Sequence, residues 1–159
     1  MELDALLPQV LTSLFREIVH GPPGDLALVV NPGDPGLIGS LAALPASQAS
    51  ARPGGRSSVA AHVQHLRYGL TLLNRWASGD QNAFADSSFA ESWSHQQVND
   101  DEWRLLRQAF EDEARQWQAR LEAPREWDPV TLSGFMSSVA HTAYHMGAIR
   151  QLVPQDAKI

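Results

Sequence analysis

Hydrophobic residues recur every three or four positions in four stretches of the chain, and this period predicts four amphipathic α-helices. Polar side chains fill the positions between them, so each helix is expected to pack on one face only. Pro8 falls inside the first stretch and predicts either a helix start near Leu6 or a bend. The four stretches cover about residues 2–20, 59–79, 99–123 and 128–154.

The ends of these stretches carry signals that are typical of helix termini. Ser57 or Ser58 can cap the second helix, and Asn99 can cap the third, where three acidic residues follow in the first turn. Asp128 and Pro129 are a capping residue followed by proline at the first helical position. An aromatic stripe of the third helix is expected to lie in the core: Trp103, Phe110 and Trp117.

Two long connections separate the first three helices. Residues 21–55 are rich in proline and glycine, yet they contain the apolar runs 26–30 and 37–44. We therefore expect this segment to pack across the helices, with a short helix near 36–44. The apolar run 26–30 stays open as the one stretch that could form a short extended segment. Residues 80–98 are polar and rich in serine, and three aromatic residues are expected to anchor them to the core: Phe84, Phe89 and Trp93.

Length and composition define the class of protein. The chain has 159 residues, of which 43% are hydrophobic, which is typical of one globular domain. With no strand pattern or internal repeat, residues 1–159 are expected to form a single all-α domain. The predicted architecture is a four-helix bundle with long crossover connections after helices one and two.

Charge and the absence of cysteine narrow the function further. The net charge of −6 gives no basic footprint, so nucleic acid is not an expected partner. No apolar run reaches the roughly 18–20 residues that span a membrane, and the N-terminus lacks the basic start of a signal peptide. A cytoplasmic protein is therefore expected. Without cysteine, any metal ion must be bound by histidine, carboxylate or water.

Histidines provide the main candidate chemistry. His141 and His145 lie four residues apart in the last predicted helix, on one face, where two imidazoles can bind one metal ion. Position 142 is threonine, so the glutamate that serves as general base in the His-Glu-x-x-His zinc proteases is missing. The alternative is a pair of pocket or core histidines with satisfied hydrogen bonds.

A second pair in helix two, His62 and His65, could supply a third imidazole, and by periodicity either residue could reach inward. Three neutral ligands would leave a divalent ion its full charge and an open position. Such an ion lowers the pKa of a bound water or thiol. His62 is also a candidate for an additional ligand or a pocket position.

Other candidate residues are weaker. Tyr144 is a candidate pocket residue, although its position on the helix is more typical of a packing residue than of a catalytic acid. A carboxylate from the second connection, Asp86 or Glu91, could support the site as a hydrogen-bond partner or general base. His20 and His95, next to predicted loops, are expected to be solvated. Three arginines could recognise an anionic substrate: Arg67, Arg75 and Arg150.

Two motifs resemble those of a known superfamily. Residues 58–66, Ser-Val-Ala-Ala-His-Val-Gln-His-Leu, match a helix-two signature in which a small residue and valine precede a His-Leu pair. Residues 141–151 are similar to the last helix of the same proteins, which carries a His-x-x-x-His pair. On these motifs the chain resembles the DinB-like superfamily of four-helix metalloenzymes, which includes the YfiT-like proteins.

This resemblance implies a metal site and a class of reaction. The implied ligands are His65, His141 and His145, and the implied cofactor is a divalent metal such as zinc or nickel. Members of the superfamily are often dimeric and include S-transferases and isomerases that use a low-molecular-weight thiol such as bacillithiol or mycothiol. The chain departs from the simplest pattern in having His62 where a hydrophobic residue is usual, and in the long segment 21–55. The helix-two ligand and the substrate therefore stay open.

Three functions are consistent with these observations. The first is a metal-dependent enzyme acting on a small molecule, a thiol-dependent S-transferase or isomerase, as a homodimer. The second is a non-catalytic helical module that binds a small molecule or dimerises through its histidines. The third is a metal-dependent hydrolase that uses bound water. No catalytic residue beyond the metal ligands is assigned.

Overall fold

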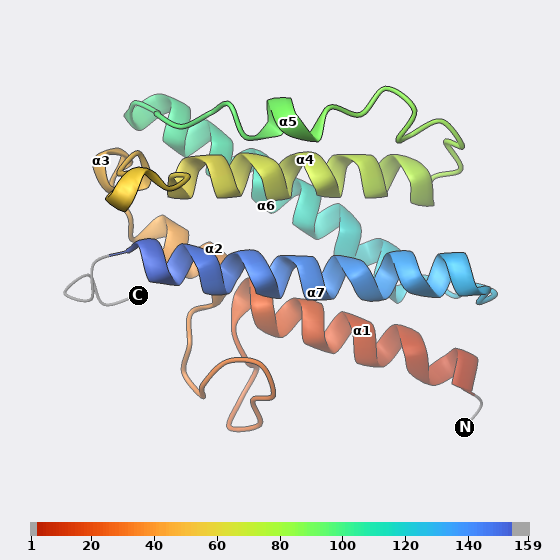
Figure 1. The fold of residues 1–159 in the computed structure, drawn as a ribbon. Helices are drawn as coiled ribbons and strands as arrows, with labels where there is room; N and C mark the ends of the chain where they lie inside the picture. The colour runs from red at the N-terminus through yellow and green to blue at the C-terminus, as the bar shows by residue number, and fades with distance from the viewer. Residues whose placement is uncertain (1–2, 154–159) are drawn as a thin grey trace.

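The computed structural model describes residues 3–153, and every regular element within this range is helical. The prediction of an all-α protein is therefore confirmed. Figure 1 shows four long helices, which lie close to the predicted stretches: α1 (Leu3–His20), α4 (Val59–Ala77), α6 (Asp100–Glu122) and α7 (Pro129–Leu152). Four short elements occur in the connections: α2 (Gly36–Ala42), α3 (Ala46–Ala49), the 3-10 turn η1 (Pro53–Gly55) and α5 (Phe89–Ser92). Pro154 and residue 2 lie outside the described range.

The long helices share one apolar core. Helix α4 packs against α6 and α7, and α1 packs against α6, α7 and the short α2 (Figure 1). The aromatic stripe of α6 is buried as predicted, from Trp103 through Phe110 to Trp117. Phe15 of α1 and Phe135 of α7 are fully buried in the same cluster. Each amphipathic face is therefore covered by its neighbours, which stabilises helices that would be marginal alone.

The predicted helix starts are confirmed by their caps. The Ser58 hydroxyl accepts a hydrogen bond from the backbone N–H of Ala61, so the cap of α4 is Ser58. Asn99 and Glu102 form a reciprocal capping box at the start of α6. Asp128 accepts hydrogen bonds from two backbone N–H groups in the first turn of α7. Pro8 lies inside α1, which begins before Leu6 rather than at it.

The first long connection contains the predicted short helix, as α2, and the run 26–30, which the sequence left open as an extended segment, forms a bend rather than a strand. Leu26 and Leu28 are 77% and 71% exposed. The reason is the buried carboxylate of Glu17 in α1, whose Oε1 accepts hydrogen bonds from the backbone N–H groups of residues 28, 29 and 30 at 2.6–3.0 Å. The backbone turns toward Glu17, so the side chains of Leu26 and Leu28 face outward.

Two further contacts hold this connection in place. Arg150 of α7 donates hydrogen bonds to both carboxylate oxygens of Asp34, at 2.7 and 2.8 Å. Gly21 and Gly36 both have positive φ and approach each other so closely that a Cβ at Gly36 would lie 2.3 Å from the Gly21 nitrogen. Only glycine fits this crossing of the chain.

The second long connection runs beside α4. Figure 1 shows α5 beside α4. Trp93 is half-buried and packs against the helices as expected, but Phe84 and Phe89 are each 43% exposed. The prediction that these two phenylalanines anchor the segment in the core is therefore wrong. Among the helices between residues 3 and 153, none combines the length and hydropathy that crossing a membrane would require.

Candidate metal site

Three histidine side chains from two helices converge on one point. The Nε2 atom of His141 lies 3.2 Å from that of His65 in α4 and 2.9 Å from that of His145, one turn further along α7. One ligand atom of each ring lies within 4.8 Å of the others, so the three could hold a metal ion. This is the convergence that the histidine spacing predicted, with His65 rather than His62 as the contribution of α4.

The spacing of the three nitrogens suits a small divalent ion. Imidazole nitrogens bind zinc at about 2.0–2.1 Å, so two such ligands at tetrahedral angles lie about 3.3–3.4 Å apart. The observed separations of 2.9 and 3.2 Å are close to this value. Two unprotonated ring nitrogens this close would repel each other through their lone pairs, so a proton or a cation must lie between them.

A hydrogen bond to Ser92 of α5 determines which nitrogen of His65 is free. The Ser92 hydroxyl donates to the carbonyl oxygen of Phe89 at 2.6 Å, which commits its only proton. Its oxygen lies 2.8 Å from Nδ1 of His65 and must therefore accept a hydrogen bond from it. His65 is thus protonated on Nδ1, and the lone pair on Nε2 is directed at the other two histidines.

His62 plays the corresponding role for His145. Their Nδ1 atoms lie 2.9 Å apart, so one of the two nitrogens donates to the other. When His145 is the donor, its Nε2 carries a lone pair toward the convergence point, as a ligand requires. His62 therefore contacts the site through the far side of His145, and its own ring is not one of the three that converge.

Trp93 covers one side of the cluster. Its indole stacks on the His65 ring with centroids 4.3 Å apart and an interplanar angle of 20°. It also meets His62 edge-on at 5.0 Å. A flat aromatic cover restricts the rotation of both rings and excludes water from that side.

Burial keeps these histidines neutral. Desolvation lowers the pKa of all four below the ordinary value of 6.5. It lowers the pKa of His65 to about 4 and that of His145 to about 3, with help from the neighbouring imidazoles. At neutral pH each ring therefore keeps one unprotonated nitrogen, which is the form that binds metal.

A hollow of about 260 Å³ opens beside His141. Its wall is built from α4, α7 and the segment around α5: Gly69, Leu73, Phe84, Phe89, Gly134, Ser137, Ser138 and His141. Gly69 follows His65 by one helical turn, and the absence of a side chain there leaves space beside the His141 ring. The side of the cluster next to His141 thus has room for a small molecule.

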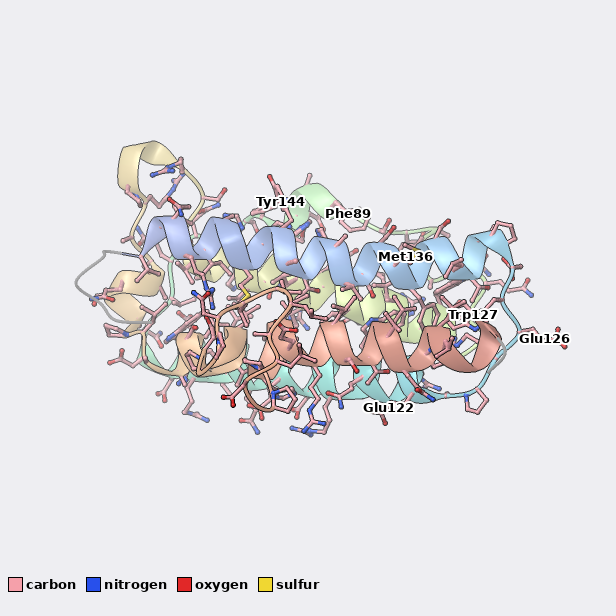
Figure 2. The ribbon with its side chains drawn as sticks, turned by 90° about the horizontal axis from the view of Figure 1, so that it is seen from below. Phe89, Glu122, Glu126, Trp127, Met136 and Tyr144 are labelled. Carbon is pink, nitrogen blue, oxygen red and sulfur yellow. The ribbon has the colours of Figure 1, made fainter. Side chains whose placement is uncertain are left out.

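Several predicted site residues lie elsewhere. Tyr144 is 71% exposed, and Figure 2 shows it at the outer edge of α7; its ring meets the His145 ring edge-on, and it is not among the residues that line the hollow. Asp86 and Glu91 are exposed and do not line the hollow. His20 and His95 are exposed, as expected.

The arginines do not face the site. Arg75 is paired with Asp80 at 2.6 Å, and Arg150 with Asp34. Arg67 donates a hydrogen bond to Gln64, and none of the three lines the hollow. The expectation that one of them recognises an anionic substrate in this hollow therefore finds no support in the geometry.

Sequence reasoning missed three residues of the site's surroundings: Ser92, Trp93 and Gly69. Ser92 and Trp93 lie in a polar connection, and their contacts with His65 depend on how that connection folds back on α4. Gly69 could have been found, because it follows His65 at a spacing of four residues in the same helix. Comparison of the chain with protein-family models, with curated proteins and with solved structures found no match in any of the three.

Proposed function

We propose that the protein is a metal-dependent enzyme in which His65, His141 and His145 hold one divalent ion. The observation that carries this proposal is the convergence of three Nε2 atoms at 2.9 and 3.2 Å from two separate helices. Two independent hydrogen bonds, one from His65 Nδ1 to Ser92 and one between the Nδ1 atoms of His145 and His62, hold the outer nitrogens of two of these rings. Oriented imidazoles are typical of built metal sites rather than of chance neighbours.

The donor set favours zinc or nickel. Imidazole nitrogen suits zinc, copper, iron and nickel, whereas calcium and magnesium require oxygen ligands. Three protein ligands are the usual number at a catalytic zinc, where the fourth position is left for water or substrate. The hollow beside His141 supplies space on that side of the cluster. When bound, the ion would act as a Lewis acid that lowers the pKa of a thiol or water in the open position.

The protein's own residues divide the remaining tasks. Ser92 fixes the His65 ring, and the hydrogen bond with His62 Nδ1 fixes the His145 ring. Trp93 excludes water from one side of the cluster. The hollow between α4 and α7 would position the substrate next to His141, so that bound groups are oriented before reaction.

The nucleophile is better assigned to a thiol than to water. Hydrolysis through bound water commonly uses a nearby carboxylate or histidine as general base, but no carboxylate lines the hollow. A thiol has an ordinary pKa near 8.5 and loses its proton easily near a cation, so it needs no such base. We therefore place a thiol-dependent S-transferase or isomerase first and a hydrolase second. This assignment agrees with the DinB-like four-helix family that the motifs in α4 and α7 resemble.

Metal analysis tests the proposal directly. Protein purified without a histidine tag should contain, or take up from zinc or nickel solution, about one ion per chain. Replacing His65, His141 or His145 with alanine should abolish stoichiometric uptake. His95→Ala is the matched control, because His95 is exposed and outside the cluster. Metal content that is unchanged in the three variants would overturn the proposal and leave a non-catalytic helical module.

A further inference from the structure

We propose that the hollow beside His141 binds the uncharged, apolar body of a small substrate, which presents a single metal-binding group to the histidine cluster. The inference rests on the proposed metal site and specifies its class of substrate. It replaces the expectation of an anionic substrate recognised by arginine. Four features of the hollow carry it: the side chains of its wall, the state of its hydroxyl groups, the absence of charge, and two half-exposed aromatic rings.

The wall of the hollow is mostly apolar. Leu73 and the two phenylalanines, Phe84 and Phe89, contribute hydrocarbon, and two glycines contribute no side chain. The Ser138 hydroxyl accepts a hydrogen bond from Trp117 Nε1 and donates one to the carbonyl oxygen of Phe135. It therefore has no proton left for a ligand. The polar groups available to a bound molecule are the Ser137 hydroxyl at the rim and the His141 ring.

Charge is absent from the wall. None of its eight residues is aspartate, glutamate, lysine or arginine. An ionised group inside the hollow would lose its hydration without gaining a partner of opposite charge, which is strongly unfavourable. The only place for a charged or polar head is next to the imidazoles. The substrate is therefore polar at one end and uncharged elsewhere.

Phe84 and Phe89 provide exposed apolar surface that an apolar ligand would bury, which favours binding. Each ring is 43% exposed, although both line the hollow. An apolar body placed between them and α7 would remove this surface from water, which is favourable in proportion to the area covered. The volume of about 260 Å³ corresponds to roughly nine water-sized groups, enough for a phenyl ring or a short branched alkyl chain.

The first test uses cobalt-loaded protein and two thiols that differ in their bodies. Phenylmethanethiol and mercaptoacetate can each bind Co²⁺ as a thiolate, releasing the proton to the buffer, and binding is followed by sulfur-to-cobalt charge-transfer absorption. We expect phenylmethanethiol to bind at least about tenfold more tightly, a difference of about 1.4 kcal/mol. Equal binding, or a preference for mercaptoacetate, would overturn the inference while leaving the metal site intact.

A matched pair of variants locates the binding site. Ser137→Tyr places a large side chain in the hollow from an exposed position, whereas Ser133→Tyr makes the same change one turn earlier in α7, outside the hollow. Ser137→Tyr should weaken phenylmethanethiol binding at least tenfold, and Ser133→Tyr should leave it unchanged. Cobalt uptake should be the same in both. Tight binding to Ser137→Tyr would place the thiol's body outside the hollow and overturn the inference.

A second measurement does not depend on the metal. Benzyl alcohol added to metal-free protein should give a saturation-transfer NMR signal that disappears in Ser137→Tyr and persists in Ser133→Tyr. If the wild-type protein takes up no cobalt, the proposed function fails, but this signal still shows whether the hollow accepts an apolar body. Absence of the signal in the wild-type protein would overturn the inference even if the metal is bound.

Discussion

Nδ1 of His65 lies 2.8 Å from the hydroxyl oxygen of Ser92, and the hydroxyl proton is committed to the Phe89 carbonyl. A four-residue helix in a connecting segment thus determines which nitrogen of a histidine on α4 is available for binding. The link joins local structure to chemistry, because the Ser88 cap of α5 and the return of this segment onto α4 bring Ser92 to His65. The site therefore extends beyond the two helices that carry its histidines.

Ser92→Ala should weaken metal binding about 10–100-fold, the usual effect of losing the hydrogen-bond partner of a metal ligand. The physical reason is that His65 loses the acceptor that holds its proton on Nδ1, so ring rotation and the other tautomer become accessible. Competition with a chromophoric chelator measures the affinity. Ser94→Ala is the control in the same segment, because Ser94 is exposed. Equal affinities for the two variants would show that Ser92 does not orient His65.

His62→Phe should reduce metal affinity by about tenfold while one ion per chain is still bound. Phenylalanine preserves a ring beside Trp93 but removes the acceptor for His145 Nδ1. The measurement is metal stoichiometry together with affinity. Complete loss of stoichiometric binding would mean instead that His62 is itself a ligand, the alternative that the sequence left open.

Gly134→Ala and Gly147→Ala should differ in stability, although both lie in α7. A Cβ at Gly134 would lie 2.9 Å from the Trp76 ring, whereas a Cβ at Gly147 meets nothing within 4 Å. We expect Gly147→Ala to raise the free energy of unfolding by about 0.5–1 kcal/mol through helix propensity. The free energy of unfolding of Gly134→Ala should be about 1–3 kcal/mol lower than that of Gly147→Ala, because the added methyl group is crowded by Trp76. Urea unfolding measures both. A stabilised Gly134→Ala would show that Trp76 moves aside freely.

Glu17→Gln should remove a pH-dependent contribution to stability. Burial alone would raise the pKa of Glu17, but hydrogen bonds from the backbone N–H groups of Val30, Val29 and Leu28 outweigh it and lower the pKa below 4.5. The ionised carboxylate is thus favoured in the folded state. Its contribution is fully present above pH 4.5 and is lost as the pH falls through the folded-state pKa. The variant should be less stable by about 1–3 kcal/mol at pH 7.

The control for this prediction is Glu126→Gln, which alters an exposed carboxylate between α6 and α7 (Figure 2). Its free energy of unfolding should equal that of the wild-type protein at pH 7. The gap between wild type and Glu17→Gln should narrow as the pH is lowered from 5 to 3. A gap that stays constant over this range would mean that the charge of Glu17 does not contribute.

Local signals explain why the helices could be predicted. Ser58, Asn99 and Asp128 act on backbone N–H groups two or three residues away, so their roles are visible in the sequence. The His141 and His145 pair is local in the same sense, because helix geometry alone places the rings on one face. The choice between His62 and His65 needed the packing angle of α4 against α7, which no local pattern encodes.

Contacts between distant residues were not predictable. The Glu17 carboxylate accepts hydrogen bonds from backbone N–H groups eleven to thirteen positions later. This contact turns the backbone of the run 26–30 toward α1, so its leucine side chains face solvent instead of the core. Phe84 and Phe89 looked like core residues because aromatic side chains usually are, but the hollow between α4 and α7 leaves them half-exposed. In both segments the tertiary contacts outweighed the general preference of apolar and aromatic side chains for burial.

His65 and His141 are 76 positions apart in the chain. A single ion shared by them would close a loop that contains the whole of α6, tying the N-terminal half of the molecule to its last helix as a reversible cross-link. Such a link restricts the unfolded chain more than a short-range contact does. The rate of unfolding would then depend on the concentration of free metal. The three histidines would thus set the stability of the protein as well as its reactivity.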